Sequence, residues 1–366
     1  MNKIKYIATT LVFCLIVGGF CGWLLIKSPD KISDWERRPL AQFPEVSYEN
    51  LMEGRFMRDF ESYANEQFPL RNTFRRIKAM VLFNLYQQKD NNGVYFAEGH
   101  VSKYDSVITR QQLDDFNKAI NSIYEDNIKG SDCKVYYSII PDKNYFLAEK
   151  NGYPGFDYDY LYSEVNKGLG KNMQEIVIKD KLLADNFYKT DTHWRQESIV
   201  DVANHIRKEM GMKPVDDYTQ HSAGDFYGVY YGQSALDLEP DEIIYLENEQ
   251  IMAATVFDVE KNKNVPVYDL DKLSELDHYD LFLSGARRPF MKITNPMGKE
   301  DKRLVVFRDS FGSSLVPLLI SDYSEIVVID IRDLHPNMIP QLVEFTDQDV
   351  LFIYSTMVVN SKEILR

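Results

Sequence analysis

Cysteine, tryptophan and histidine are all scarce in this sequence. Its 366 residues include three cysteines, three tryptophans and six histidines. Cys14 and Cys21 fall inside an N-terminal apolar run, so Cys133 has no partner for an internal disulfide in the rest of the chain. A fold without disulfides must be held together by its hydrophobic core, and a chain of this length can form a large one.

Positive charge is also in short supply. Lys and Arg number 42 against 56 Asp and Glu, which gives a formal net charge of −14. Proteins that bind nucleic acid need clustered positive side chains to neutralise phosphates, so we predict no nucleic-acid partner. Apolar residues make up 44% of the chain and charged residues 27%, which is typical of a globular protein.

The N-terminus carries a long uncharged stretch. After Lys3 and Lys5, the 21 residues from Tyr6 to Ile26 contain no charged side chain. This length spans a bilayer as a helix and exceeds the apolar part of most cleaved signal peptides, and no convincing cleavage site follows. We therefore predict a transmembrane signal anchor at residues 1–27, which places the protein in the cell membrane as a single-pass protein.

The orientation of this anchor rests on weaker signals. Four positive residues follow the span, namely Lys27, Lys31, Arg37 and Arg38, and this count alone does not favour an external location for the rest of the chain. The short basic segment before the span and the family resemblance described below favour the other orientation. We therefore predict that the catalytic domain is extracytoplasmic.

The remaining chain is predicted to be a linker followed by one domain. Residues 28–50 are polar and contain proline, which suits a juxtamembrane linker, and we assign the domain to residues 51–366. The segment from about 215 to 285 is acidic, rich in Gly and Tyr, and contains short strand-like pieces, so we predict that it is an insertion. Residues 48–88 have helical periodicity with a break at Pro69.

Apolar runs rich in β-branched and aromatic residues predict the central sheet. They lie at residues 134–140, 304–308, 326–332 and 350–355. Runs of this kind, separated by helical segments, indicate parallel βαβ units, so we predict an α/β fold with a parallel sheet sandwiched by helices. We also predict a short strand at residues 186–190 and an amphipathic helix from Arg195 to Gly211.

Two polar turns are placed where strands are predicted to end. The first, "KTDTHW" (189–194), contains Asp191 and His193, and the second, "FRDSFG" (307–312), contains Ser310. In an open parallel sheet, functional groups gather at the carboxyl ends of the strands. A serine needs a base within hydrogen-bonding reach and a group that orients this base, and His193 and Asp191 can serve in these roles.

The residues alone leave two other interpretations open. Asp and Ser are common helix N-caps, which explains both turns without any chemistry. The Asp-x-His pair is also a plausible pair of metal ligands, but a zinc site needs a third and fourth ligand, and the other histidines form no His-x-x-x-His pair. We therefore predict no metal and no cofactor.

The two turns, in this order and about 115 residues apart, resemble the DHHW family of SGNH-hydrolase-like proteins. The resemblance extends to "NEQFPLRNTF" (65–74) and "GDFYGVYYG" (224–232). This family is similar to the periplasmic alginate O-acetyltransferases and other extracytoplasmic polysaccharide acetyltransferases. The sequence departs once from the family's namesake string, because Thr192 stands where the second letter is His. That position is not the expected base, so the predicted chemistry is unaffected.

The resemblance implies an SGNH-hydrolase-like, flavodoxin-like fold in which the order of the catalytic blocks is permuted, with the Asp-x-His block before the serine. It further implies that Ser310 is the nucleophile, His193 the general base and Asp191 its orienting partner.

The resemblance also suggests residues that bind the oxyanion or the substrate. These are the Ser310 backbone N–H, Arg332 and Tyr354 at neighbouring strand ends, and Lys143 close after Pro141. Arg332 is equally well explained by an ion pair with a neighbouring aspartate, and Lys143 by a salt bridge.

We therefore predict an extracytoplasmic O-acyltransferase, with acetyl as the expected acyl group. It would modify hydroxyls of an exopolysaccharide or cell-wall glycan through an acyl-serine intermediate. Acetyl-CoA is absent outside the cytoplasm, so the resemblance implies a membrane-bound O-acyltransferase partner as acyl supplier. The same triad would serve a carbohydrate esterase, and a non-catalytic glycan-binding or assembly protein is the third alternative.

Overall fold

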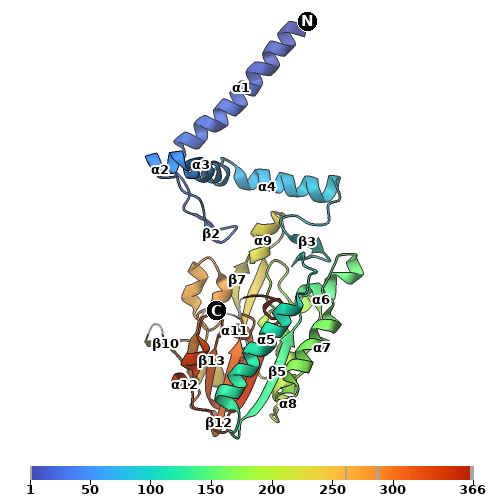
Figure 1. The fold of residues 1–366 in the computed structure, drawn as a ribbon, viewed down its shortest axis with the longest axis vertical. Helices are drawn as coiled ribbons and strands as arrows, with labels where there is room; N and C mark the ends of the chain where they lie inside the picture. The colour runs from blue at the N-terminus through green and yellow to red at the C-terminus, as the bar shows by residue number, and fades with distance from the viewer. Residues whose placement is uncertain (1, 260–261, 286–287, 363–366) are drawn as a thin grey trace. The chain divides into compact units, whose positions relative to one another are not determined.

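The computed structural model describes residues 2–259, 262–285 and 288–362. The chain forms two compact units (Figure 1). The smaller unit comprises Met1–Asn92 and Tyr231–Leu238, and the larger one comprises Gly93–Tyr230 and Glu239–Arg366. The predicted boundaries of anchor, linker, domain and insertion stay predictions, and residues 363–366 of the predicted domain lie outside the described residues.

The smaller unit begins with helix α1 (Asn2–Ile26). Its residues 3–26 are long and apolar enough to cross a membrane, with a mean hydropathy of 2.2 over the 18 residues that define the span. At 1.5 Å per residue, a helix of this length covers the roughly 30 Å of hydrocarbon in a bilayer. The apolar N-terminal helix that the sequence predicts is therefore present.

A short hairpin and a row of helices follow α1. The hairpin pairs β1 (Ile32–Ser33) with β2 (Arg38–Pro39). The helices are α2 (Tyr48–Met52), α3 (Arg55–Glu66), α4 (Arg71–Met80) and the π-helical turn η1 (Val81–Leu85). The predicted helical region is confirmed, and its break falls between α3 and α4 around Pro69, because proline has no N–H to continue a helix.

The larger unit is built on an eight-stranded sheet. Its order is β10-β9-β11-β13-β12-β14-β5-β6. The strands are β5 (Lys134–Ile140), β6 (Gln174–Glu175), β9 (Thr255–Asp258), β10 (Lys263–Val265), β11 (Phe290–Thr294), β12 (Lys299–Arg308), β13 (Tyr323–Ile329) and β14 (Asp349–Ser355). The strands from β13 to β6 are parallel, and β11, β9 and β10 add an antiparallel edge. The four predicted core strands are confirmed.

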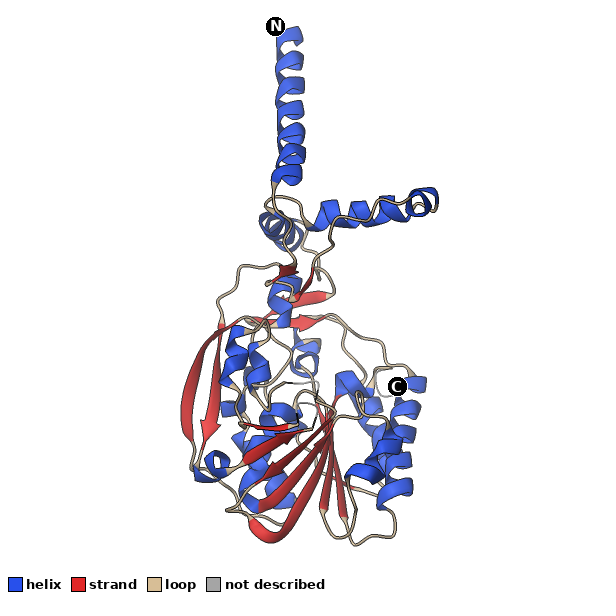
Figure 2. Ribbon diagram, turned by 90° about the vertical axis from the view of Figure 1, so that its left-hand side faces the viewer, coloured by secondary structure: helices blue, strands red, loops and turns tan. Residues whose placement is uncertain are grey.

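Alternate side chains of each central strand enter different hydrophobic clusters. Leu304 and Val306 of β12 enter one cluster, whereas Val305 and Phe307 enter the other. The first cluster is covered by α8 (Val200–Glu209), α11 (Gly312–Leu315) and η9 (Val316–Asp322), and the second by α5 (Arg110–Ile123) and α7 (Tyr158–Leu169). Helices therefore lie on both faces of the twisted sheet (Figure 2), which confirms the predicted α/β class.

Shorter elements connect these layers. They are the hairpin β3 (Val94–Ala97) and β4 (His100–Lys103), then η2 (Tyr124–Ile128), α6 (Lys143–Leu147), η3 (Glu149–Asn151), η4 (Lys179–Lys181), η5 (Ala184–Asn186), η6 (Gln196–Ser198), η10 (Pro336–Met338), α12 (Ile339–Leu342) and α13 (Thr356–Val359).

The segment predicted as an insertion has the expected strand-rich character. It holds β7 (Thr219–Phe226), α9 (Val229–Ser234), β8 (Asp241–Glu247), α10 (Glu249–Ala253), β9, β10, η7 (Leu270–Ser274) and η8 (His278–Leu281). β7 and β8 pair with each other in a separate antiparallel sheet, whereas β9 and β10 extend the main sheet.

One predicted strand is wrong. Residues 186–190 contain the end of η5 and a single bridge between Phe187 and Trp194, not a strand. Phe187 and Tyr188 are buried in the first cluster, which explains their apolar character without any strand pairing. The helix predicted to start at Arg195 begins as the 3₁₀ turn η6 and becomes α-helical at Val200, with Ile206 fully buried as expected.

The order of the parallel strands creates a switch point. The chain leaves β12 for β13 on one side and then returns to β14 on the other side of β12. Connections that leave adjacent strands in opposite directions open a crevice at the carboxyl ends of those strands, where ligands bind in this class of fold. Ser310 follows β12 directly and therefore lies at this point.

Candidate active site

His193 lies between a carboxylate and a serine hydroxyl. Its Nδ1 is 2.6 Å from Asp191 Oδ1, and its Nε2 is 2.8 Å from Ser310 Oγ. With its Nδ1–H donated to Asp191, the imidazole keeps Nε2 free to accept the serine proton. Asp191 is 2% exposed and His193 is 8% exposed. The structure thus joins two motifs that are 117 residues apart in one hydrogen-bonded chain.

The loop that carries Asp191 is held by backbone and carboxylate contacts from residues of the predicted insertion (about 215–285). The Val229 N–H donates to Asp191 Oδ2 at 2.9 Å. Asp241, at the start of β8, accepts from the N–H of Lys189 at 2.7 Å and from the N–H and hydroxyl of Thr190 at 2.8 and 2.6 Å. These contacts fix the carboxylate before any substrate binds, so orientation of the imidazole needs no rearrangement.

Gly228 permits this close approach. A Cβ at this position would lie 2.3 Å from the Asp191 Cα and 2.3 Å from the Thr190 carbonyl oxygen. Its N–H also donates to Thr190 Oγ1 at 2.8 Å. The central glycine of "GDFYGVYYG", Gly228, is thus required by contact with the Asp-x-His loop.

Tyr279 lies flat against the imidazole. The ring centroids of Tyr279 and His193 are 3.8 Å apart and their planes differ by 6°. The Tyr279 hydroxyl lies 2.8 Å from Ser314 Oγ and donates to the Ser310 carbonyl at 3.3 Å. Burial raises the pKa of Tyr279 well above its ordinary value, so its phenol stays neutral. A neutral aromatic face stabilises a cation stacked on it, and the imidazolium formed by proton transfer would be such a cation.

The turn after β12 is organised by Asp309. Its buried carboxylate accepts from the Phe311 N–H at 3.0 Å and from the Ser355 N–H at 2.7 Å, so it ties the ends of β12 and β14 together. The Gly312 N–H donates to the Asp309 carbonyl at 3.0 Å. The Ser310 N–H is left as the candidate donor of this turn to a developing oxyanion.

Trp194 connects the two motifs. Its indole N–H donates to the Phe311 carbonyl at 3.1 Å and to Ser314 Oγ at 2.9 Å. The side chain is fully buried and packs edge-on against Phe311. Trp194 therefore anchors the loop by packing, and its indole adds a hydrogen-bonded link to the segment that carries Ser310.

Lys143 has a different environment from the one predicted. Its ammonium group is buried and donates to the carbonyls of Val101, Tyr188 and Lys189, the last two at 3.0 and 3.3 Å. Burial lowers the pKa of Lys143 to about 7, although the nearby charges of Asp191 and two other aspartates oppose this shift. The side chain thus holds the backbone just before Asp191, and a contact with substrate stays a prediction.

Arg332 and Tyr354 are engaged elsewhere. The Arg332 guanidinium donates to both oxygens of Asp330, at 2.9 and 2.7 Å, as the ion-pair explanation anticipated. Asp330 also lies 3.6 Å from the buried Arg308. Tyr354 is fully buried in the second cluster, with its ring edge-on to Phe116. A role of either side chain toward the oxyanion or the substrate stays a prediction.

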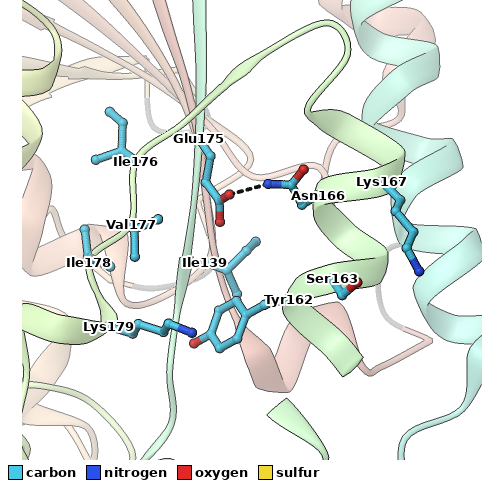
Figure 3. A pocket seen from close by; sticks show the side chains of 10 residues that line it. All are labelled: Ile139, Tyr162, Ser163, Asn166, Lys167, Glu175, Ile176, Val177, Ile178 and Lys179. Carbon is cyan, nitrogen blue, oxygen red and sulfur yellow. Dashed lines mark hydrogen bonds between the residues drawn. The ribbon is translucent and has the colours of Figure 1, made fainter. Parts of the chain in front are cut away.

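No metal-binding cluster occurs in the described part of the chain, where no group of three or more His, Cys, Asp or Glu could hold an ion. A pocket of about 360 Å³ lies between α7 and the β5–β6 edge of the sheet (Figure 3). Tyr162, Asn166 and Glu175 are among its lining residues, and the triad is not. This pocket is therefore separate from the candidate active site.

The residues that sequence reasoning missed are Asp241, Val229 and Tyr279. Tyr279 is one of 24 tyrosines, and no motif around it distinguishes it from the others. Asp241 and Val229 act through contacts between segments that are distant in sequence, which spacing does not show. Gly228 lies in the motif "GDFYGVYYG" (224–232), so the sequence did offer a signal that this position needs a glycine.

The sequence and the fold both match known proteins. The model of the family described as "DHHW protein" matches residues 154–329. A DHHW family protein from Eubacterium siraeum aligns with a TM-score of 0.61 at 21% identity, covering 75% of this chain and 94% of that protein. Bacillus cereus PatB1, solved with a sulfonyl adduct, aligns with a TM-score of 0.59 at 18% identity over 74% of this chain and 97% of PatB1. Without the adduct, PatB1 aligns with a TM-score of 0.55 at 16% identity, over 74% and 98% of the two chains.

No curated protein matches the sequence significantly. The structural neighbours share the fold, and the family match includes Asp191, His193 and Ser310 within its bounds. The predicted resemblance is thereby confirmed: this chain carries the DHHW family pattern over residues 154–329, on an α/β fold that it shares with PatB1.

Proposed function

We propose that this protein is an O-acyltransferase that moves an acyl group, expected to be acetyl, onto a hydroxyl of an exopolysaccharide or cell-wall glycan. The observation that carries the proposal is the hydrogen-bonded chain from Asp191 through His193 to Ser310 Oγ, with distances of 2.6 and 2.8 Å. A binding protein would need none of these contacts. The transfer to a sugar, rather than to water, is taken from the family resemblance.

The first half of the reaction forms an acyl-serine. His193 Nε2 takes the hydroxyl proton of Ser310 while Oγ attacks the carbonyl carbon of the donor ester, and the carbonyl oxygen becomes an oxyanion that the Ser310 N–H can stabilise. The imidazolium then returns the proton to the leaving oxygen as the ester bond breaks. Asp191 and the stacked Tyr279 ring stabilise the positive charge on His193 between these steps.

The second half uses the same groups in reverse. A sugar hydroxyl gives its proton to His193 Nε2 and attacks the acyl-serine carbonyl, which forms a second tetrahedral oxyanion. Collapse of this intermediate breaks the bond to Ser310 Oγ, and His193 protonates that oxygen. The outcome is a sugar ester and the original enzyme, with no cofactor required.

The proposed location is outside the cytoplasm, with α1 as a transmembrane anchor. The support is the length and hydropathy of residues 3–26. Acyl groups would then have to come from a membrane-bound O-acyltransferase that passes them across the membrane, and an anchor would keep the two proteins in one plane. Arg332, Tyr354 and Lys143 have no direct substrate role in this proposal, because their side chains are engaged or buried.

The proposal is tested with Ser310→Ala in the full chain. Turnover of an activated acetyl ester should fall by about a thousandfold or more, because the nucleophile is lost. Ser313→Ala is the matched control: Ser313 is fully buried, and its hydroxyl has no hydrogen-bond partner among the described residues, so this change should leave activity intact. Undiminished turnover by Ser310→Ala with an unchanged circular dichroism spectrum would refute the triad.

A second experiment separates the acyl acceptors. PatB1 has been solved with a sulfonyl adduct, so a sulfonyl fluoride is a suitable probe here, and it should label Ser310 only while His193 is intact. After labelling has identified the nucleophile, mass spectrometry of an added oligosaccharide distinguishes acetyl transfer from release of acetate. Exclusive release of acetate would indicate an esterase, and absence of both labelling and turnover would indicate a non-catalytic protein.

A further inference from the structure

A stripe of exposed apolar side chains runs along α4 and η1 in the smaller unit. It consists of Leu70, Phe74, Ile77, Val81 and Leu85, all of them exposed. Their spacing of three or four residues places them on one face of the helix. Ala79 is the one fully buried residue of α4, so its other face packs on the protein while the apolar stripe faces away. Such a stripe needs a cover that the described residues of this unit do not provide.

Contacts near the C-terminal end of α1 indicate what surrounds the stripe. Phe20 of α1 stacks on Phe68 with ring centroids 5.2 Å apart, and its ring lies edge-on to Phe74 at 5.8 Å. Phe20 precedes Ile26, the last residue of α1, by six positions, which corresponds to about 9 Å along the helix axis. If α1 crosses a membrane, side chains that touch Phe20 therefore lie at the depth of the headgroups or just below them.

The charge of the same segment fits a membrane surface. Residues 71–89 contain Arg71, Arg75, Arg76, Lys78 and Lys89 and no acidic residue, although the whole chain has a net charge of −14. Arg71 and Arg75 both pair with Glu36, and Arg76 pairs with Asp237 at 2.8 Å. Five positive side chains against these two carboxylates leave the segment positive overall, and Lys78 is exposed beside the stripe. Positive side chains next to an apolar face are typical of helices that lie in the interface of anionic bilayers.

We propose that α4 and η1 form an interfacial helix, with the apolar stripe inserted into the same membrane that α1 crosses. The inference rests on the proposed span of α1. The stripe would enter the boundary between headgroups and acyl chains by about 5–10 Å, while the exposed Lys78 contacts lipid phosphates. A protein partner would cover the stripe equally well, but it would not explain the contacts of Phe68 and Phe74 with Phe20 inside the span.

The test uses the full chain in nanodiscs of phosphatidylcholine and phosphatidylglycerol, one chain per disc. In a background with Cys14→Ala, Cys21→Ala and Cys133→Ala, a polarity-sensitive fluorophore is attached at Ile77→Cys or, as a control on the exposed side of α8, at Lys208→Cys. A third protein keeps Cys14, which lies in the middle of α1, and reports on the span itself. Nitroxide lipids labelled near the headgroup or at the chain end, and aqueous iodide, serve as quenchers.

The label at position 77 should lose most of its fluorescence to nitroxides near the headgroup and little to iodide, and the label at position 208 should show the opposite. Cys14 should be quenched by nitroxides at the chain end. If Cys14 is quenched and position 77 is reached by iodide, the span holds and the interfacial helix is wrong. Protection of position 77 from both quenchers would indicate protein contact and would also overturn the proposal. If Cys14 is not quenched, the span itself fails.

Discussion

At the scale of single residues, His193 is tightly constrained. Asp191 holds its Nδ1, Ser310 its Nε2, and Tyr279 its ring face. The contacts with Asp191 and Ser310 favour one tautomer, and the stack on Tyr279 favours one ring orientation. The candidate base is therefore in position before any substrate arrives.

The stack on Tyr279 predicts a measurable effect on the imidazolium. Tyr279→Leu removes the aromatic face, so kcat/KM for an acetyl ester should be about 2- to 30-fold lower than in Tyr279→Phe, which keeps the ring. Equal kcat/KM values of the two variants would exclude this role of the ring.

Lys143 predicts a pH dependence of stability. Burial lowers its pKa to about 7 in the folded protein, from an ordinary value of 10.5. Between these two values the unfolded chain binds more protons at this site, so the free energy of unfolding rises with pH, by up to about 1.4 kcal/mol per pH unit. Below about pH 7 the amine is protonated in both states, and this contribution to the slope disappears.

Lys143→Met tests this dependence because it retains the length of the side chain and removes the amine. Urea unfolding at several pH values between 7.5 and 9.5 should give a flatter slope for the variant than for the natural protein, whatever its absolute stability. Lys208→Met, on the exposed side of α8, is the control and should retain the natural slope. Parallel slopes for Lys143→Met and the natural protein would contradict the assignment.

At the scale of elements, the segment predicted as an insertion (about residues 215–285) contributes residues that support the candidate site. Asp241 of β8, the backbone at residues 228–229 and Tyr279 of η8 all contact the triad or its loop. On the other side, Trp194 ties the same loop to the segment after β12. The distance between His193 and Ser310 is thus set by elements on both sides of the crevice.

Gly228→Ala tests this support from the insertion. The new Cβ would overlap the backbone at Asp191, so the Asp-x-His loop has to shift. A displacement of about 1 Å at reacting groups can lower the rate about a hundredfold, and overpacking costs about 1–3 kcal/mol of stability. Gly22→Ala is the control, since no heavy atom lies within 4 Å of a Cβ at this position, and it should leave activity unchanged. Full activity of Gly228→Ala in the esterase assay would show that the loop tolerates the shift.

At the scale of the whole molecule, the orientation of α1 decides which side of the membrane holds the larger unit. We expect protease added to intact protoplasts to digest the chain beyond α1, since the proposed function requires an extracytoplasmic location. A cytoplasmic protein of the same cells should survive as a control for intact membranes. Survival of the full chain, with digestion only after lysis, would mean that Lys27, Lys31, Arg37 and Arg38 retain the larger unit inside.

Much of the fold could be predicted because its signals are local. The runs at 134–140, 304–308 and 350–355 are buried on both faces, and burial on both faces gives an uninterrupted apolar string. The strand predicted at residues 186–190 was wrong because Phe187 and Tyr188 are buried by packing within a loop. A pair of buried apolar residues has the same sequence pattern in a loop as in a strand.

Composition, hydropathy and periodicity sufficed for the apolar N-terminal helix and the parallel α/β class, because each depends on neighbouring residues. The roles of the three residues of the candidate triad came from the family resemblance. The contact of His193 with Ser310, the stack of Tyr279 and the burial of Lys143 were decided only by the folded chain. These are contacts across the crevice or within the core, and they depend on how segments up to 117 residues apart pack together.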